Sequence, residues 1–381
     1  MQIIKKFDKA ANLIYYAAIL IHILIMCEGF SVWETPFRGR LLQIACVLCC
    51  IKILMTYYEK VEWALIGIAG ALSIASYVCT KEKYVVYVAV LIIAARNVDM
   101  KVVLSLIFEG VLISTVLIAI FALTGLGGDI SETRDFGRGI VETRYMLGFS
   151  HANNLHGTVW YIFAAMILLY KKKIDWKIYA AATVLNIVLY CFTHSKTGLL
   201  VAQIVIIGGV LYTYFDKQVF EKIWAYITGA VVYILILILT IVSVTVNPWD
   251  NYGKFLTRLN DILTNRIKLS YESAYIGDWN ALTMGGSHKD TIDNGFVALA
   301  AEYGYIILAV YAVFVGYLFY KSYKEKEGAA LVILVTAVMY IFMERSYMIN
   351  DAFLLSNLIY VIAMMFMGIK KGDNIQGEMQ S

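Results

Sequence analysis

Long apolar runs separated by short polar loops constrain the fold of this chain more than any other feature. Twelve runs meet or approach the ~20 apolar residues that a helix needs to cross a hydrocarbon core of about 30 Å. They lie near residues 10–28, 40–56, 61–80, 84–95, 102–124, 154–170, 176–193, 198–215, 223–246, 294–320, 328–343 and 352–369. Only helices and closed barrels satisfy their backbone groups inside lipid. The runs therefore predict an all-α integral membrane protein with about 12 transmembrane helices, forming one polytopic domain over residues 1–381.

The composition excludes two other classes of protein. The chain is 61% hydrophobic and 16% charged, whereas soluble domains are roughly 45–50% apolar and about 25% charged. A soluble enzyme and a disordered protein are therefore excluded. The 6 cysteines all fall inside apolar runs without metal-ligand spacing, so we interpret them as small buried hydrophobes. The net charge of +4 comes from basic residues in short loops, and no nucleic-acid partner is expected.

Basic residues fix the expected orientation of the chain. Lysines 5, 6 and 9 precede the first run, which predicts a cytoplasmic N-terminus and a first helix that acts as a signal anchor. The run at 84–95 is the weakest candidate span. With twelve spans, the lysines near 171–177, 217–222, 321–326 and 370–371 also lie inside. If 84–95 did not cross, these later lysines would lie on the opposite side of the membrane from the N-terminal lysines. The expected topology is N-in and C-in.

This topology separates arginine from lysine. The inner side carries lysine with Arg96 as its sole arginine, while the other eight arginines fall on the outer side: Arg38, Arg40, Arg134, Arg138, Arg144, Arg258, Arg266 and Arg345. Guanidinium is a planar fork that binds phosphate at two points, whereas ammonium is a point charge. The outer arginines therefore predict a phosphate-bearing or acidic ligand. Lipid headgroup contact and surface ion pairing are the alternatives.

Two outer loops, 125–153 and 247–293, exceed ordinary connection length and form the proposed active-site face. In the second loop, apolar residues recur at helical spacing between 255 and 267. This spacing predicts a short amphipathic helix on the membrane surface. Arg258 and Arg266 are eight residues apart, so on one helix they would point within ~80° of each other. A surface helix with snorkelling arginines is the alternative.

Polar residues also gather at the outer ends of several spans. They occur at 151–156, at 194–197, at 288–294 and at 344–351. Asp293 is well placed as an N-cap for the span that begins there, and Asn154 could hydrogen-bond between helices. No zinc or magnesium spacing, P-loop or dinucleotide-binding glycine pattern occurs. No metal and no cofactor are therefore expected.

Four stretches together resemble a known family. They are residues 144–154 (RYMLGFSHANN), 193–198 (THSKTG), 265–266 (NR) and 293–304 (DNGFVALAAEYG). Their order, their spacing and their predicted position on one side of the membrane resemble those of the Wzy-type O-antigen and capsular polysaccharide polymerases. This family is related to the O-antigen ligases. The resemblance covers most of the chain through its hydropathy profile.

The resemblance implies a metal-independent glycosyltransferase in the bacterial cytoplasmic membrane. Such an enzyme moves a growing glycan from undecaprenyl pyrophosphate to a sugar hydroxyl of a second lipid-linked repeat, in capsule, exopolysaccharide or O-antigen biosynthesis. Implied partners are the undecaprenyl-pyrophosphate-linked oligosaccharide, membrane lipid, and a flippase and chain-length regulator of the same pathway. Asp293 and His288 are the implied candidates for a general base. The implied binding residues are Arg266 and Arg144 as pyrophosphate clamps, Arg258 and Lys196 assisting, and His151, Asn154, His194, Asn294 and Arg345 around them.

Two departures from the family pattern bear on the function. Lys196 stands where arginine is usual, which weakens bidentate phosphate binding there. Asp293 stands where the ligases tend to carry histidine, which favours a polymerase. The alternatives are a ligase-type glycan transferase, a lipid-oligosaccharide flippase or other transporter, and a membrane sensor or scaffold. Transporters usually carry internal repeats and mid-membrane charges, whereas this chain concentrates its polar groups in the outer loops.

Overall fold

The apolar runs fold into helices. The computed structural model describes residues 2–30, 36–135, 141–246, 254–263, 265–276, 292–345, 348 and 354–368. Each predicted run overlaps one of these helices: α1 (Gln2–Phe30), α2 (Arg38–Leu54), α3 (Lys60–Thr80), α4 (Tyr84–Ala94), α5 (Met100–Leu123), α6 (Ala152–Tyr170), α7 (Trp176–Thr193), α8 (Lys196–Tyr214), α10 (Ile223–Thr245), α13 (Gly295–Lys324), α14 (Gly328–Met343) and α15 (Leu358–Gly368).

In the described part of the chain, seven helices are long and apolar enough to cross a membrane: α1, α3, α5, α7, α8, α10 and α13. Helices α4, α14 and α15 are apolar but shorter, with 11, 16 and 11 residues. The protein is therefore an all-α membrane protein, as the sequence predicts. The number of 12 spans and their orientation stay predictions.

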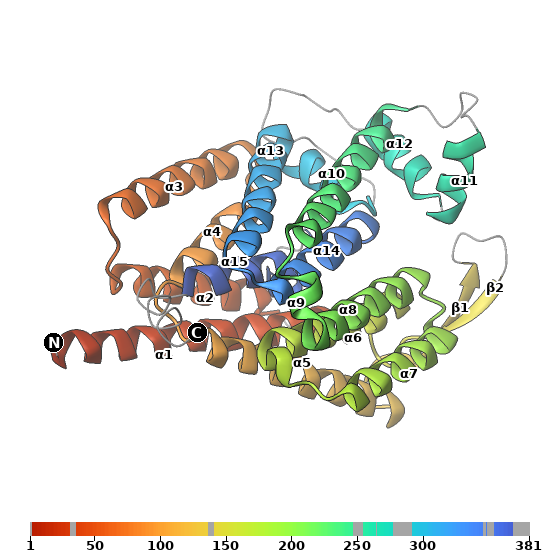
Figure 1. Cartoon of the computed structure of the whole chain (residues 1–381), viewed down its shortest axis with the longest axis horizontal. Coiled ribbons are helices and arrows are strands. Elements are labelled where there is room, and N and C mark those ends of the chain that lie inside the picture. The colour runs from red at the N-terminus through yellow and green to blue at the C-terminus, as the bar shows by residue number, and fades with distance from the viewer. Residues whose placement is uncertain are drawn as a thin grey trace.

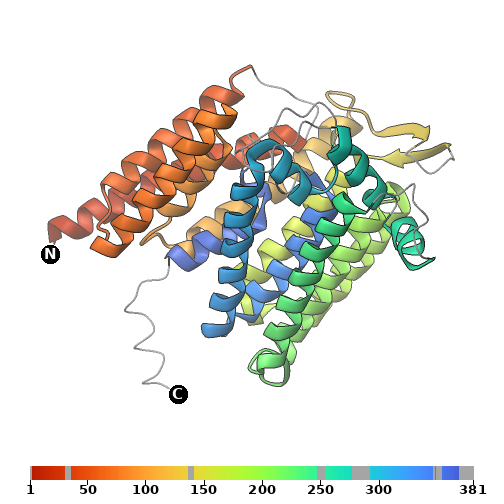
Figure 2. The same ribbon diagram turned by 90° about the horizontal axis from the view of Figure 1, so that it is seen from above.

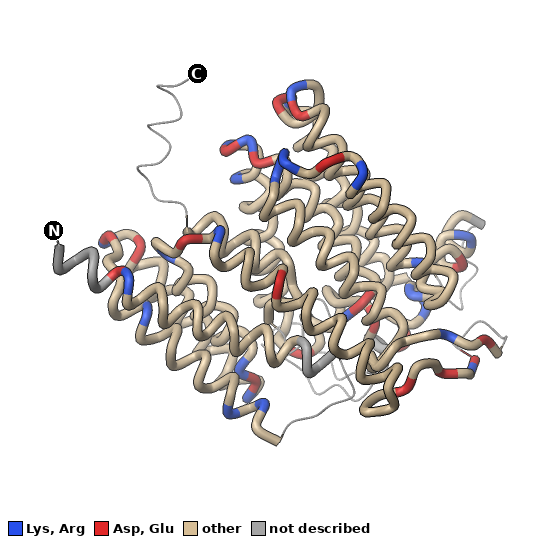
Figure 3. The backbone as a smooth tube through the Cα atoms, turned by 90° about the horizontal axis from the view of Figure 1, so that it is seen from below, with Lys and Arg blue, Asp and Glu red and all other residues tan. Residues whose placement is uncertain are grey.

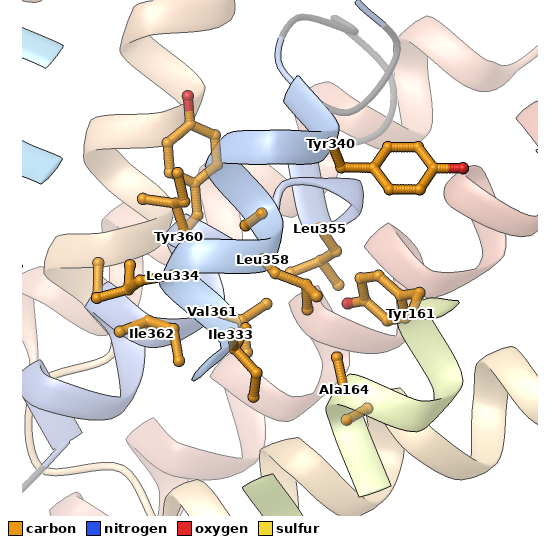
Figure 4. Close-up of a cluster of buried hydrophobic side chains, with 14 of the residues drawn as sticks. Tyr161, Ala164, Ile333, Leu334, Tyr340, Leu355, Leu358, Tyr360, Val361 and Ile362 are labelled. Atoms are coloured by element: carbon orange, nitrogen blue, oxygen red, sulfur yellow. The ribbon is translucent and has the colours of Figure 1, made fainter. Parts of the chain in front are cut away.

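Helix α14 lies at the centre of the bundle. It contacts α6, α8, α10, α13 and α15, and Figures 1 and 2 show it enclosed by them. Nearly all residues of α14 and α15 are buried, so these two apolar helices are surrounded by protein. Figure 4 shows side chains of α14, of α15 and of the short helix η3 (Leu354–Ser356) in one cluster with those of α6: Tyr161, Ala164, Ile333, Leu334, Tyr340, Leu355, Leu358, Tyr360, Val361 and Ile362.

Charged residues gather at the helix ends and connections, and the middles of most helices lack them (Figure 3). At the end predicted to be cytoplasmic, the short helices η1 (Lys171–Lys173) and α9 (Asp216–Val219) carry ion pairs. Lys171 Nζ lies 3.2 Å from Glu327 Oε1, and Lys172 Nζ lies 2.6 Å from Asp216 Oδ2. This distribution is expected because unpaired charges are costly in hydrocarbon.

The first of the two long loops forms a hairpin that the sequence did not predict. Strands β1 (Ser131–Asp135) and β2 (Val141–Tyr145) pair antiparallel, with Thr133 opposite Thr143 and their hydroxyls 2.8 Å apart. Figure 1 shows the hairpin beyond the ends of α7 and α8. Cross-strand threonine pairs stabilise such ribbons. The hairpin carries Arg144 back towards the helix bundle.

The second long loop forms two helices where the sequence predicted one. Helix α11 (Lys254–Ile262) ends before Asn265, whose φ of 63° is left-handed, and α12 (Arg266–Ile276) begins after it. Asparagine tolerates this conformation, and Asn265 Oδ1 accepts a hydrogen bond of 2.9 Å from Asn260 Nδ2. The predicted alignment of Arg258 and Arg266 on one helix is therefore wrong. A further short helix, η3 (Leu354–Ser356), precedes α15.

Candidate functional site

A polar cavity of about 850 Å³ opens where α6, α8, α12 and α13 begin, at the end of the bundle that the sequence predicts to be outer. We refer to it as the outer cavity. It is lined by Arg134, Asp135, Arg144, His151, Asn153, Ser195, Lys196, Thr197, Asp261, Asn265, Arg266, Lys268, Leu269, Glu272, Asp293 and Glu344. Five of the predicted site residues are in this set, although they come from four separate stretches of sequence: Arg144, His151, Lys196, Arg266 and Asp293.

Helix N-termini supply part of the electrostatics of the outer cavity. The first amides of a helix have no partner within it, and the helix dipole adds partial positive charge at this end. At α8, Ser195 is the N-cap, and its hydroxyl accepts a 3.2 Å hydrogen bond from the Gly198 amide. The amides of Lys196 and Thr197 remain directed to the start of the helix. Anions bind readily at such a terminus.

Lys196 adds a full positive charge at the same point. Its side chain is exposed, and in the described part of the chain it forms no ion pair or hydrogen bond. The family resemblance implies an assisting role for Lys196 behind Arg144 and Arg266. Lys196 and the α8 N-terminus therefore offer an exposed cation and free helix amides at one point of the outer cavity.

The two arginines predicted as clamps line the outer cavity, and acidic neighbours hold both. Arg266 begins α12 and donates from Nε to the Met343 carbonyl oxygen at 2.8 Å and from Nη2 to Glu344 Oε1 at 2.9 Å. Arg144 is 5% exposed and donates from Nε to Glu142 Oε1 at 2.8 Å. Since each guanidinium is fixed by a carboxylate, both are positioned before any ligand arrives.

Glu344 is the site residue that sequence reasoning missed. It follows α14 directly, and its Oε1 accepts hydrogen bonds of 2.9 Å from both Asn153 Nδ2 and Arg266 Nη2. Burial raises the pKa of Glu344 to about 7, and Asp293 acts in the same direction, while Arg266 and Asn153 oppose the rise. One signal in the sequence could have indicated Glu344 as a site residue: it follows an apolar run directly, like the other polar residues at the ends of spans.

His151 is the N-cap of α6, and its Nδ1 accepts a 3.1 Å hydrogen bond from the Asn153 amide. Burial lowers the pKa of His151, and the positive charges of Arg144 and Arg134 lower it further. A neutral imidazole that accepts at Nδ1 carries its proton on Nε2. His151 therefore lines the outer cavity as a hydrogen-bonding group rather than as a cation.

The predicted N-cap at α13 is wrong by one residue. Asn294 caps the helix, because its Oδ1 accepts from the amides of Phe296 at 3.0 Å and Val297 at 3.3 Å. Asn294 is 1% exposed, and its Nδ2 has no hydrogen-bond partner among the described residues. Because Asn294 performs the capping, the carboxylate of Asp293 is left to line the outer cavity.

Four other predicted residues lie outside the lining of the outer cavity. Asn154 donates from Nδ2 to Ser150 Oγ at 2.8 Å, and its neighbour Asn153 takes the lining position instead. His194 ends α7 with Nδ1 3.5 Å from Glu142 Oε2. Arg345 pairs with Glu302, and Arg258 is exposed on α11. The candidate base His288 lies outside the described residues.

The class of protein to which this chain belongs is defined by its fold and by the outer cavity. Comparisons with models of known families, with curated proteins and with solved structures found no match for this chain. Among the described residues, no three histidine, cysteine or acidic side chains lie close enough to hold a metal ion. The class is an all-α membrane protein whose cavity combines helix N-termini, basic side chains and partly buried carboxylates.

Proposed function

We propose that this protein is a polymerase of lipid-linked oligosaccharide repeat units. It transfers a growing glycan from undecaprenyl pyrophosphate to a sugar hydroxyl of another lipid-linked repeat, at the outer face of the bacterial cytoplasmic membrane. One observation carries the proposal: Arg144, Lys196 and Arg266, which lie in different stretches of sequence, line a single cavity beside the N-terminus of α8. Helix N-termini and basic side chains both bind phosphate groups, so this arrangement supports the binding of a pyrophosphate.

The pyrophosphate lies best at the start of α8. Lys196 and the amides of Lys196 and Thr197 provide donors there, and Arg144 and Arg266 add positive charge in the lining of the same cavity. Negative charge develops on the leaving pyrophosphate as its bond to the sugar breaks. Preorganised cations and amides that face this charge stabilise the transition state more than the ground state.

The transfer itself is a displacement at the anomeric carbon of the donor. The acceptor hydroxyl loses its proton to a base, and its oxygen forms a bond to that carbon. The bond between the carbon and the pyrophosphate oxygen breaks, and the electron pair leaves with undecaprenyl pyrophosphate. Ligand sites commonly have volumes of roughly 300–1,000 Å³, and the outer cavity, at about 850 Å³, has room for a diphosphate and the sugars at the bond that is exchanged.

The deciding experiment combines purified protein in lipid with undecaprenyl-pyrophosphate repeat units from the native host. Products of the wild type, Arg266→Lys and Arg40→Lys are resolved on a gel. We expect a ladder of lengthening glycan with release of undecaprenyl pyrophosphate. Arg266→Lys should reduce the rate at least tenfold because lysine cannot replace the planar fork. Arg40→Lys, at an arginine of α2 that does not line the outer cavity, should leave the rate unchanged.

Other outcomes identify the other functions. A full ladder from Arg266→Lys keeps the polymerase and overturns the role of Arg266. Transfer of a single glycan to a different lipid acceptor, without a ladder, identifies a ligase. A chemically unchanged substrate that moves between the leaflets of the vesicle identifies a flippase and overturns the proposal.

A further inference from the structure

We propose that Glu344 is the catalytic base that takes the proton from the acceptor hydroxyl. This inference rests on the proposed function and goes beyond it, because it assigns the base to a carboxylate in the connection after α14. The sequence pointed instead to Asp293 and His288.

The two carboxylate oxygens of Glu344 have different surroundings. Oε1 accepts both hydrogen bonds, from Asn153 Nδ2 of α6 and from Arg266 Nη2 of α12, each 2.9 Å long. Oε2 has no hydrogen-bond partner in the part of the chain that the structure describes, and Glu344 lines the outer cavity. One oxygen is therefore anchored while the other remains to accept a proton, which is the geometry that a general base needs.

Three helices hold Glu344 in place. The Glu344 amide donates to the Tyr340 carbonyl oxygen at 2.8 Å, which extends the last turn of α14. Arg266 Nε binds the neighbouring Met343 carbonyl oxygen at 2.8 Å. The ring of Tyr340 stacks on Trp160 of α6 with ring centroids 4.6 Å apart. Sites built on packed helices position a catalytic group more closely than mobile loops do.

The electrostatic surroundings suit proton transfer near neutral pH. The groups that face the Glu344 carboxylate are Arg266 from α12, Asp293 from the start of α13, and the neutral amide of Asn153 from α6. Burial and Asp293 raise the pKa of Glu344 to about 7, and Arg266 limits the rise. A base works best when its pKa lies near the working pH. By contrast, no hydrogen bond among the described residues fixes the side chain of Asp293.

The Arg266–Glu344 ion pair couples the two halves of the reaction. While Glu344 is ionised, its charge compensates that of Arg266 across 2.9 Å. When Glu344 Oε2 takes the acceptor proton, this compensation ends, and Arg266 presents its full charge to the outer cavity. Negative charge appears on the leaving pyrophosphate during the same displacement. The positive charge that is freed on Arg266 therefore offsets the negative charge that develops on the leaving pyrophosphate.

The test measures kcat, KM and the pH profile of Glu344→Gln in the polymerisation assay. Removal of a general base costs roughly 10²–10⁴-fold in kcat, while KM for the lipid-linked substrate should change less than threefold. The wild-type kcat should rise with pH and level off above about 7, since only ionised Glu344 accepts a proton. Glu344→Gln should lose this rise. Exogenous formate should restore part of the rate of Glu344→Ala, because formate supplies the missing carboxylate.

The chain offers a matched control at the other end of the same helix. Glu327 is the N-cap residue of α14 and pairs with Lys171, far from the outer cavity. Glu327→Gln should keep kcat and the rise with pH. If Glu344→Gln does not fold, Glu344→Asp serves instead, and it should retain the pH profile with a lower kcat because its carboxylate is one methylene shorter.

The remaining outcomes overturn the proposal. A wild-type rate for Glu344→Gln overturns the assignment of Glu344 as the base and leaves the proposed polymerase function standing. Loss of the pH rise in Asp293→Asn but not in Glu344→Gln assigns the base to Asp293. A wild type that builds no ladder and releases no undecaprenyl pyrophosphate overturns the proposed function together with the base.

Discussion

At the residue scale, a buried histidine positions the N-terminus of α8 beside the outer cavity. His156 of α6 is fully buried, with Nδ1 3.0 Å from Thr193 Oγ1 and Nε2 2.8 Å from Asn186 Oδ1. Gly198 lies against the imidazole, so close that an added Cβ would be 2.5 Å from His156 Cγ. The absence of a side chain at Gly198 thus allows α8 to approach α6 and bring Lys196 to the outer cavity.

We expect Gly198→Ala to destabilise the fold by about 1–3 kcal/mol, because the added methyl overpacks a buried contact. The polymerisation rate should fall with it, since α8 must shift away from α6. Gly316→Ala is the matched control, because an added Cβ there meets nothing within 4 Å, and alanine is worth up to about 1 kcal/mol in helix propensity. Thermal unfolding of the purified variants tests this, and equal melting temperatures for both would contradict the packing argument.

At the element scale, a kink divides α13 into two parts. Gly304 has φ 85° and ψ 166° within the helix, a region that glycine alone adopts readily. The part before the kink is almost wholly buried and carries Glu302, which pairs with Arg345. The part after it continues to Lys324. The kink lets the segment that begins at Asp293 lie in the wall of the outer cavity while the rest of α13 runs along the bundle.

Gly304→Ala is therefore expected to cost about 1–3 kcal/mol in backbone strain and to lower the polymerisation rate by moving Asp293 away from the outer cavity. The melting temperature and the rate are measured on the same preparation. Gly316→Ala again serves as the control, since it lies in the same helix after the kink. A Gly304→Ala variant with wild-type stability and rate would show that the kink is not needed.

At the scale of the whole molecule, the basic clusters predict that both termini are cytoplasmic. This orientation requires α4, with 11 residues, to cross the membrane. Five crossings, by α1 to α5, place the β1–β2 hairpin on the side opposite the N-terminus. Four crossings would place both on the same side. The hairpin contributes Arg144 to the outer cavity, so the side on which the cavity opens depends on α4.

Single cysteines at three exposed positions test this orientation: Lys9→Cys, Ser131→Cys and Lys173→Cys. A membrane-impermeant maleimide applied to intact cells should label Ser131→Cys fully and the other two less than a tenth as much, and permeabilised cells should label all three. The unsubstituted protein controls for its native cysteines. Equal labelling of Lys9→Cys and Ser131→Cys in intact cells would mean that α4 does not cross.

The fold class could be predicted from the sequence because its cause is local. A run of about 20 apolar residues is stable in lipid only as a helix, whatever its neighbours are. Local rules also found the polar span ends, and five of the predicted side chains line one cavity. The same rules failed where a shift of one residue along a helix changes the direction in which a side chain points. Asn153 lines the outer cavity in place of Asn154 because adjacent residues on a helix point about 100° apart.

The sequence by itself determined a membrane protein of apolar helices with its arginines gathered in a few connecting segments. Only the tertiary structure decided which of these side chains meet. Arg266 and Glu344 are 78 residues apart in sequence, and Asn153 and Glu344 are 191 apart. Their contacts depend on the tertiary packing that brings ends of α6, α12 and α14 to one cavity, and on the burial and charge at that place. Periodicity within a segment carries no information about the segments that will surround it, which is why Glu344 became a candidate base only in the folded chain.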